Sequence, residues 1–124
     1  AYITGIDHRI EAHQLGSRNL IDSMSTRIAG EAAGVTKGKV DIAELHAPFS
    51  HQELLLKQAL GLGDDTVINA SGGPLAGNIM MSAGLSNFGE VAMRIIKGEA
   101  HRGVAHATSG PCLQQNLVAV LEGK

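Results

Sequence analysis

Stretches rich in β-branched residues alternate with stretches of helical hydrophobic spacing along almost the whole sequence. Extended segments are predicted at residues 2–11, 40–45, 66–70, 102–110 and 115–123. Helices are predicted at residues 17–33, 50–62 and 80–99, where apolar side chains recur three or four positions apart. The predicted order is therefore β-α-β-α-β-α-β-β. Strands that alternate with helices form a layered α/β domain, and the two consecutive final strands predict a mixed sheet with helices on its faces.

Three local signals mark the ends of these elements. Gly34 follows the first predicted helix, in the left-handed position that often ends helices. Pro48 has no N–H to donate inside a sheet, so the chain is expected to turn there. Ser50 and Glu53 have the S-x-x-E spacing of a capping box, which predicts that the second helix begins at Ser50.

The length and composition narrow the class of protein. The 124 residues suit one domain, residues 1–124, and a chain of this size buries roughly two-thirds of its unfolded surface. The net charge of −2, the scattered basic residues and the 2% aromatic residues do not favour nucleic acid as a partner. The single cysteine allows no internal disulfide and no Cys/His metal signature, which fits the cytoplasm. No apolar run reaches the roughly 18 residues of a membrane span.

Glycines are concentrated between Ser71 and Gly89, just before and at the start of the third predicted helix. Without a Cβ atom, Gly72, Gly73 and Gly77 let backbone N–H groups approach a ligand closely at the N-terminus of a helix. A purely structural turn is the alternative. The methionines that follow, Met80 and Met81, either line an apolar pocket or fill the core.

Three loops that follow predicted strands carry a further pattern. The segment ELHAPF ends the second strand, NASGGPLAGNIMMSAG follows the third, and HATSGPCLQQN joins the last two. With these loops, and from GIDHRIEAH to LVAVLEG, the chain resembles the C-terminal domain of the thiolase superfamily, in particular the branch of sterol carrier protein X and the lipid-transfer-protein thiolases. The resemblance implies a thiolase-like half-fold and a CoA thioester as the ligand that the glycine loop approaches.

The resemblance also implies roles for individual residues. His46 stands at the family's Asn/His position, and Phe49 at the aromatic position of the same loop. Asn78 replaces the catalytic histidine of the second loop, and Thr108 takes the position of the catalytic cysteine, four residues before Cys112. Because this apparatus is altered, retro-aldol cleavage of a β-hydroxyacyl-CoA is an alternative to thiolysis.

Each candidate catalytic residue has a structural alternative. His46 is an acid–base or water-orienting group, or a partly buried histidine bonded to the backbone. Asn78 cannot titrate, so it donates to an oxyanion or caps the following helix, and the two roles are compatible. Cys112 is a nucleophile or an unreactive small apolar residue. The candidate ligand-binding residues are Gly72, Gly73, Gly77, Met80 and Phe49.

Two functions from different classes stay open. The first is C–C bond cleavage or formation on an acyl-CoA thioester, of acyltransferase or aldolase type, with the N-terminal half supplied by the same longer chain or by a complex. The alternative is a non-catalytic acyl-CoA-binding or lipid-transfer subunit, and a third reading is a structural dimerisation half. The resemblance implies a homo-oligomer such as a homodimer, a zinc-ribbon/OB-fold partner protein, and no cofactor besides the CoA thioester as substrate.

Overall fold

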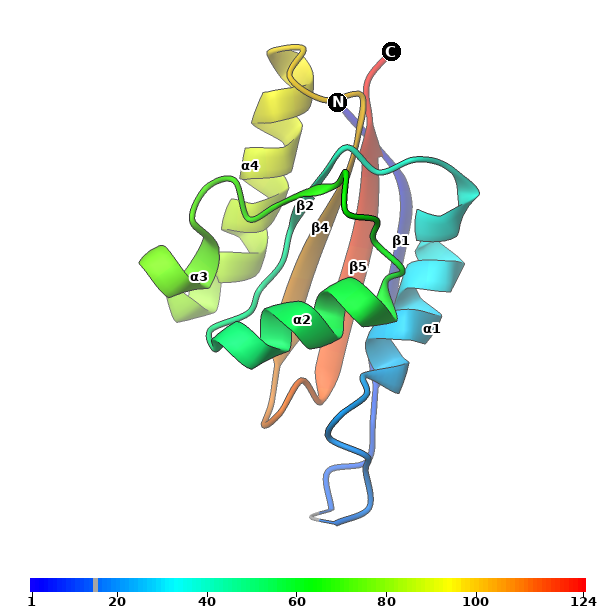
Figure 1. Cartoon of the computed structure of the whole chain (residues 1–124), viewed down its shortest axis with the longest axis vertical. Coiled ribbons are helices and arrows are strands. Elements are labelled where there is room, and N and C mark those ends of the chain that lie inside the picture. The colour runs from blue at the N-terminus through cyan, green and yellow to red at the C-terminus, as the bar shows by residue number, and fades with distance from the viewer. Residues whose placement is uncertain (15) are drawn as a thin grey trace.

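The computed structural model describes residues 1–14 and 16–124, which form one five-stranded mixed sheet with helices on both faces (Figure 1). The strands are β1 (Tyr2–Ile10), β2 (Ile42–Glu44), β3 (Val67–Ile68), β4 (Arg102–Ser109) and β5 (Gln115–Glu122). The helices are α1 (Met24–Ala33), α2 (Ser50–Ala59), α3 (Gly73–Ala76) and α4 (Ala83–Ile96), with 3₁₀ turns at Val35–Lys37 and Met80–Ser82. Within the described residues, no helix is long and apolar enough to cross a membrane.

The strands of the sheet lie in the order β1-β5-β4-β2-β3. β2 pairs in parallel with both β3 and β4, whereas β5 is antiparallel to β4 and to β1. The predicted mixed sheet and the hairpin of the last two strands are therefore confirmed. The predicted element order is met only loosely, because the structure adds the short helix α3 and two 3₁₀ turns, and because β2 and β3 are shorter than predicted.

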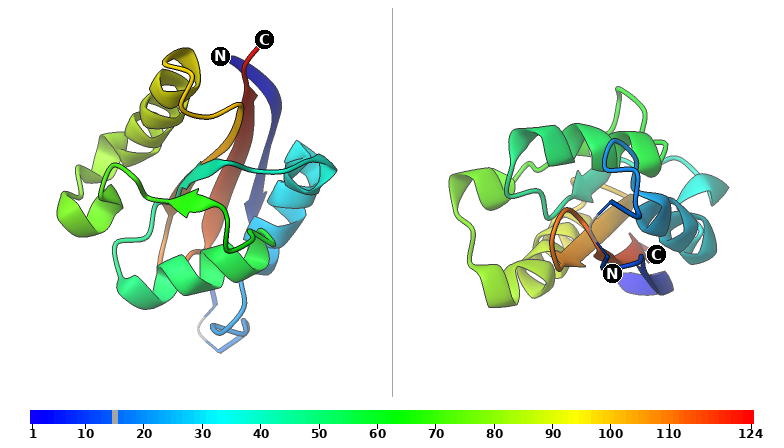
Figure 2. Two further views of the ribbon diagram at one scale, coloured as in Figure 1. Left: turned by 45° about the horizontal axis from the view of Figure 1, so that its top comes forward. Right: turned by 90° about the horizontal axis from the view of Figure 1, so that it is seen from below.

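Each face of the sheet has its own apolar core. α1 and α2 cover one face, and α4 covers the other face over β2 and β4 (Figure 2). Leu56 of α2 packs in the first core, and Val91 and Ile95 of α4 pack in the second. Successive residues of a strand point to opposite faces, so β4 contributes Val104 to the first core and Ala105 to the second.

The two capping predictions have different outcomes. Gly34 ends α1 in the left-handed conformation, with a φ of 87°, as predicted. α2 begins at Ser50 as predicted, but the capping box itself is wrong, because Phe49 occupies the N-cap position and no side chain caps the helix. Glu53 accepts a hydrogen bond from Asn69 Nδ2 at 2.6 Å instead. Glu53 thus bonds a residue that is distant in the sequence instead of the backbone at the start of its own helix.

Two helices begin later than the hydrophobic spacing predicts. The first begins at Met24 rather than at residue 17, because Arg18 donates to two backbone carbonyls of the β4–β5 turn and ties the preceding segment to that turn. The long helix begins at Ala83 rather than at Met80, because Met80 has a φ of 41°, outside the range of an α-helix.

Arg102 joins three elements at one end of the sheet. Its Nε donates to the carboxylate of Glu122 in β5 at 2.6 Å. Its terminal nitrogens donate to the carbonyl oxygens of Gly34, Val35 and Gly38, which follow α1. Only 14% of the Arg102 side chain is exposed, so these bonds are largely shielded from bulk water. The guanidinium thereby holds the end of α1 against the sheet.

The Arg102→Met variant is expected to lose about 2–3 kcal/mol of free energy of unfolding, because methionine keeps the apolar stem but loses the hydrogen bonds to Glu122 and to three carbonyl oxygens. Urea unfolding followed by circular dichroism measures the loss. The matched control is Arg27→Met, since the Arg27 side chain is in an exposed ion pair with Asp22 at 3.6 Å. Equal losses in the two variants would contradict the role given to Arg102.

Candidate functional site

Three loops start from the same end of the sheet. The carboxyl ends of parallel strands point in one direction, and in open α/β sheets ligands bind beside those ends. His46 follows β2, the glycine-rich residues 69–77 follow β3, and Thr108 lies near the end of β4. The loops that the sequence singled out therefore meet, and they define the candidate functional site.

The glycine-rich segment is held against β2 by two side chains. The carboxylate of the fully buried Glu44 accepts hydrogen bonds from the N–H of Ser71 at 3.0 Å and from its Oγ at 2.6 Å. Oδ1 of Asn69 accepts the N–H of Leu45 at 2.6 Å. A Cβ atom on Gly73, whose φ is 56°, would lie 2.8 Å from Asn69 Cγ, so the close approach requires glycine there. These bonds give the segment a defined position beside the strand end.

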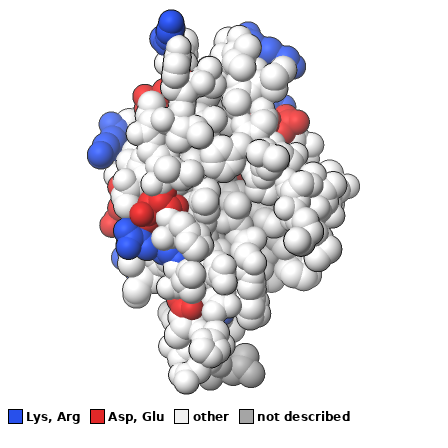
Figure 3. Space-filling view, turned by 180° about the vertical axis from the view of Figure 1, so that it is seen from behind, with Lys and Arg blue, Asp and Glu red and all other residues white. Residues whose placement is uncertain are grey.

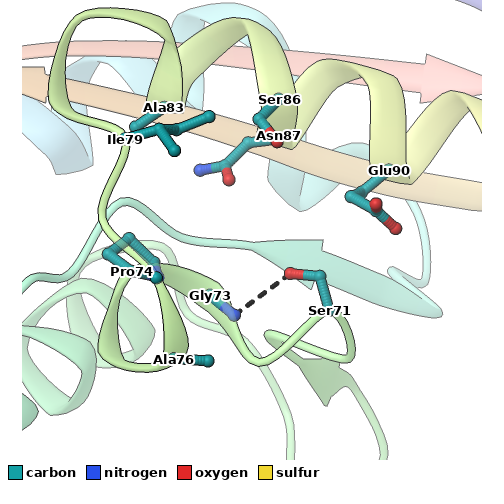
Figure 4. Close-up of a pocket in the computed structure, with 10 residues that line it drawn as sticks. Ser71, Gly73, Pro74, Ala76, Ile79, Ala83, Ser86, Asn87 and Glu90 are labelled. Atoms are coloured by element: carbon teal, nitrogen blue, oxygen red, sulfur yellow. Dashed lines mark hydrogen bonds between the residues drawn. The ribbon is translucent and has the colours of Figure 1, made fainter.

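A groove of about 340 Å³ separates the segment that includes α3 from the first turns of α4 (Figure 4). Pro74, Ile79 and Ala83 give it apolar surface. The polar side chains that line it are Ser71, Ser86, Asn87 and Glu90. Among the described residues that line the groove there is no lysine or arginine. The groove thus offers apolar contacts and uncharged hydrogen-bonding groups, with one carboxylate.

His46 is connected to this groove through Asn78. Its Nδ1 accepts the N–H of Thr108 at 3.4 Å, and its side chain is hydrogen-bonded to Asn78, which stands between the groove-lining Gly77 and Ile79. Burial lowers the pKa of His46, and the bond with Asn78 offsets part of that shift. The ring is therefore neutral at pH 7. Because Nδ1 accepts a hydrogen bond, the proton is on Nε2, the donor available to Asn78.

Behind His46, a series of buried hydrogen bonds fixes its backbone. The N–H of His46 donates to Nδ1 of His106 at 3.3 Å, so the proton of His106 is on Nε2, 2.9 Å from Oδ1 of Asn116. Asn116 Nδ2 donates to Ser25 Oγ at 2.7 Å, and Ser25 donates to the Glu11 carboxylate at 2.6 Å. Burial lowers the pKa of His106 to about 4. Each hydrogen bond between Glu11 and His46 in this series therefore has a defined donor and acceptor.

The structure brings some of the predicted site residues together and separates others. His46 and Asn78 are in contact, and Gly73 and Gly77 line the groove. Cys112 is exposed in the β4–β5 turn, where it lines a separate cavity of about 130 Å³ beside α2. The thiol therefore lies outside the groove.

The other predicted ligand contacts also lie outside the groove. Phe49 is exposed and stacks on His51, with the ring centroids 6.0 Å apart. Gly72 is the N-cap residue of α3, with a φ of 92°, so its role is conformational. Met80 is exposed, and its N–H donates to Oδ1 of Asn78 at 3.0 Å. The predicted capping of the long helix by Asn78 is wrong, because Ser82 is the N-cap residue of α4 and no side chain caps that helix.

The groove also contains residues of α4 that sequence reasoning missed, namely Ser86, Asn87 and Glu90. Asn87 is buried, and its Nδ2 donates to the carbonyl oxygen of His106 at 2.8 Å. The sequence did contain a sign of this buried amide. Asn87 lies four residues from both Ala83 and Val91, so it interrupts the apolar face of the predicted helix.

Comparison with known proteins supports a distant relationship. No protein-family model matches the sequence. The chain is 36% identical over 88 residues to sterol carrier protein 2 of Homo sapiens, in a match that covers 56% of this chain and 16% of that protein. The chain thus spans about one sixth of the length of that relative. The likeness supports a sterol carrier, thiolase-like lineage for the chain.

Proposed function

We propose that the groove binds the acyl or pantetheine part of an acyl-CoA or a related lipid, and that the protein is a lipid- or acyl-CoA-binding half of thiolase-like type. The observation that carries this proposal is the groove itself. Glycine backbone with Pro74 and Ile79 forms one wall, and α4 forms the other with Ala83 and polar side chains; the neutral His46–Asn78 pair lies beside it. The partial likeness to sterol carrier protein 2 supports lipid binding more than it supports chemistry.

The lining of the groove selects the uncharged part of such a ligand. Ile79 and Ala83 provide apolar contacts, while Ser86 and Asn87 provide hydrogen-bonding groups for a carbonyl or an amide. Glu90 repels anions, so the phosphates of CoA are expected to stay outside the groove. The volume of about 340 Å³ lies at the lower end of the range for small-molecule pockets.

A charge placed in the groove is expected to weaken this binding. In the Ile79→Glu variant, the dissociation constant of a long-chain acyl-CoA should rise at least about tenfold, because the ligand would have to bury a carboxylate against its acyl chain. Titration calorimetry with the acyl-CoA measures the constant. The matched control is Ile96→Glu, at an exposed apolar position of α4 that lies outside the groove. Equal weakening in both variants, or no binding by the unmodified chain, would contradict the proposal.

A second candidate function, chemistry on the thioester, is favoured by the contact between His46 and Asn78. A neutral imidazole that donates to the Asn78 side chain orients the amide, whose N–H groups are suited to stabilising an enolate oxygen. An enolate is common to Claisen-type acyl transfer and to retro-aldol cleavage. In this proposal the acyl-accepting nucleophile comes from an N-terminal half.

Loss of the imidazole separates the two functions. If the chain takes part in chemistry, His46→Ala should lower turnover of a β-hydroxyacyl-CoA or β-ketoacyl-CoA about 100-fold in the assembled protein, while acyl-CoA binding changes little. His51→Ala is the control, since His51 is exposed on α2. Unchanged turnover after His46→Ala would remove that residue from the mechanism.

Uncovered apolar surface supports association with an N-terminal half, in the same chain or in a complex. Leu85, Met93 and Ile96 of α4 are exposed, with Leu85 at 78%. Seen from behind, the surface carries few lysine, arginine, aspartate or glutamate side chains (Figure 3). Exposed apolar side chains that gather on one helix favour association with another protein surface.

A further inference from the structure

The groove between α3 and α4 has a buried amide in its wall, and a hydrogen bond fixes how that amide lies. Asn87 of α4 lines the groove and is only 5% exposed. Its Nδ2 donates to the carbonyl oxygen of His106 in β4 at 2.8 Å. A carbonyl oxygen can only accept a hydrogen bond, so the NH₂ group of the amide is directed at β4. Figure 4 shows the amide pointing from α4 toward the segment with Gly73.

The oxygen of this amide, Oδ1, is left as an acceptor on the groove side. Among the residues that the structure describes, no group donates a hydrogen bond to it. Because the side chain is almost wholly withdrawn from bulk water, an unmade hydrogen bond at Oδ1 costs free energy that a ligand donor would recover. Asn87 therefore favours a bound group that donates.

The opposite wall of the groove, residues 71–77, already uses its donors within the fold. The N–H and Oγ of Ser71 both donate to the carboxylate of Glu44. The N–H of Gly73 donates to Ser71 Oγ at 3.1 Å, and the N–H groups of Ala76 and Gly77 donate to backbone carbonyls at 3.3 Å. This wall therefore has few donors to offer to the carbonyl, carboxylate or phosphate oxygens of a ligand.

The groove as a whole is richer in acceptors than in donors. Glu90 lines it three residues beyond Asn87, on the same face of α4, and an ionised carboxylate only accepts. The hydroxyl of Ser86 can donate or accept. An anionic ligand group would meet acceptors and a negative charge, whereas an uncharged group with an N–H or O–H has the complementary chemistry.

We propose that Asn87 determines the ligand specificity of the groove, because its Oδ1 accepts a hydrogen bond from an N–H or O–H group of the bound chain. A ligand that carries this donor binds more tightly than one that lacks it. The inference rests on the proposed function, since it concerns an acyl-CoA or a related lipid in the same groove. Two parts of such a ligand carry the donor, namely the amides of the pantetheine arm and a hydroxyl group on the acyl chain.

Matched pairs of ligands test the proposal and distinguish the two sources. The hydroxyl pair is β-hydroxydodecanoyl-CoA and dodecanoyl-CoA. The amide pair is the octanoyl thioester of N-acetylcysteamine and that of mercaptoethyl acetate, in which an ester oxygen replaces the N–H. Titration calorimetry of the unmodified chain should give a dissociation constant about tenfold lower for the donor-bearing member of at least one pair. A preference within the hydroxyl pair identifies the acyl chain as the source, and one within the amide pair identifies the pantetheine arm.

A variant assigns the preference to Asn87. Asn87→Leu keeps a similar volume but removes Oδ1, so the tenfold preference should disappear. Asn19→Leu, at an exposed position outside the groove, is the matched control and should keep the preference. Leucine also leaves the carbonyl oxygen of His106 without its donor, so circular dichroism must show that the variant is folded.

A second measurement needs no variant. In the unmodified chain labelled with ¹³C-asparagine, the side-chain carbonyl resonance of Asn87 should move with the donor-bearing ligand and not with its partner. A resonance that stays in place, no preference within either pair, or a preference that survives Asn87→Leu would overturn this inference alone. A chain that binds no member of either pair would overturn the proposed function as well.

Discussion

Replacing Gly5 by alanine should lower the free energy of unfolding by about 3 kcal/mol. A Cβ atom on Gly5 would overlap the carbonyl oxygen of Ala33 and would lie 2.8 Å from its carbonyl carbon. Both are backbone atoms at the end of α1, so no side-chain rotation relieves the contact. Either β1 or the whole end of α1 must shift, and α1 is also held there by Arg102.

Urea unfolding of Gly5→Ala measures this effect, with Gly89→Ala as its matched control. Gly89 lies within α4, and a Cβ atom there meets nothing within 4 Å. Alanine at that position should raise the free energy of unfolding by roughly 0.5–1 kcal/mol, because glycine is the poorer helix former. A Gly5→Ala variant as stable as the unmodified chain would show that β1 and α1 are not packed as described.

Acid should destabilise the fold well before its carboxylates titrate. Burial holds the pKa of His106 at about 4, below the usual value of 6.5. In the unfolded chain His106 takes up a proton as the pH falls through 6.5, whereas in the folded protein it stays neutral until about pH 4. The free energy of unfolding should therefore decline by about 3 kcal/mol between these two pH values. The lowered pKa of His46 acts in the same direction.

Chemical unfolding at a series of pH values between about 4 and 7 measures this decline. The His106→Gln variant is less stable at pH 7, because glutamine does not reproduce both hydrogen bonds of the ring, but its stability should change less with pH over the same interval. A decline equally steep in His106→Gln would assign the proton uptake to other groups.

Much of the architecture was predictable from local patterns. Alternating and helical spacings indicated the α/β class and the final hairpin, and Gly34 marked the end of α1 because only its backbone conformation was needed for that inference. The capping box failed for a physical reason, since Glu53 bonds Asn69, which is distant in the sequence. Hydrogen bonds between residues distant in the sequence produce no repeating residue pattern from which they could be predicted.

The candidate site was predictable in part. The strand ends and the glycine spacing located the three loops, because chain order brings them to one end of a parallel sheet, while His46 and Asn78 were singled out by the resemblance to the thiolase family. The buried series from His106 through Asn116 to Glu11 was not foreseen, since it depends on the register of β5 against β4 and β1. Cys112 was placed in the site because its loop between the last two strands resembles the family's catalytic loop, yet the turn directs it to a separate cavity.

The claim that the groove binds an acyl-CoA is tested most directly by mapping the contact residue by residue. The ¹⁵N-labelled chain is titrated with a long-chain acyl-CoA, and the amide chemical shifts are followed by NMR. Changes should concentrate in residues 71–90 and at His46 and Thr108, while β1 and α1 stay unaffected. Changes confined to the cavity between β1 and α1, or no changes at all, would contradict the account.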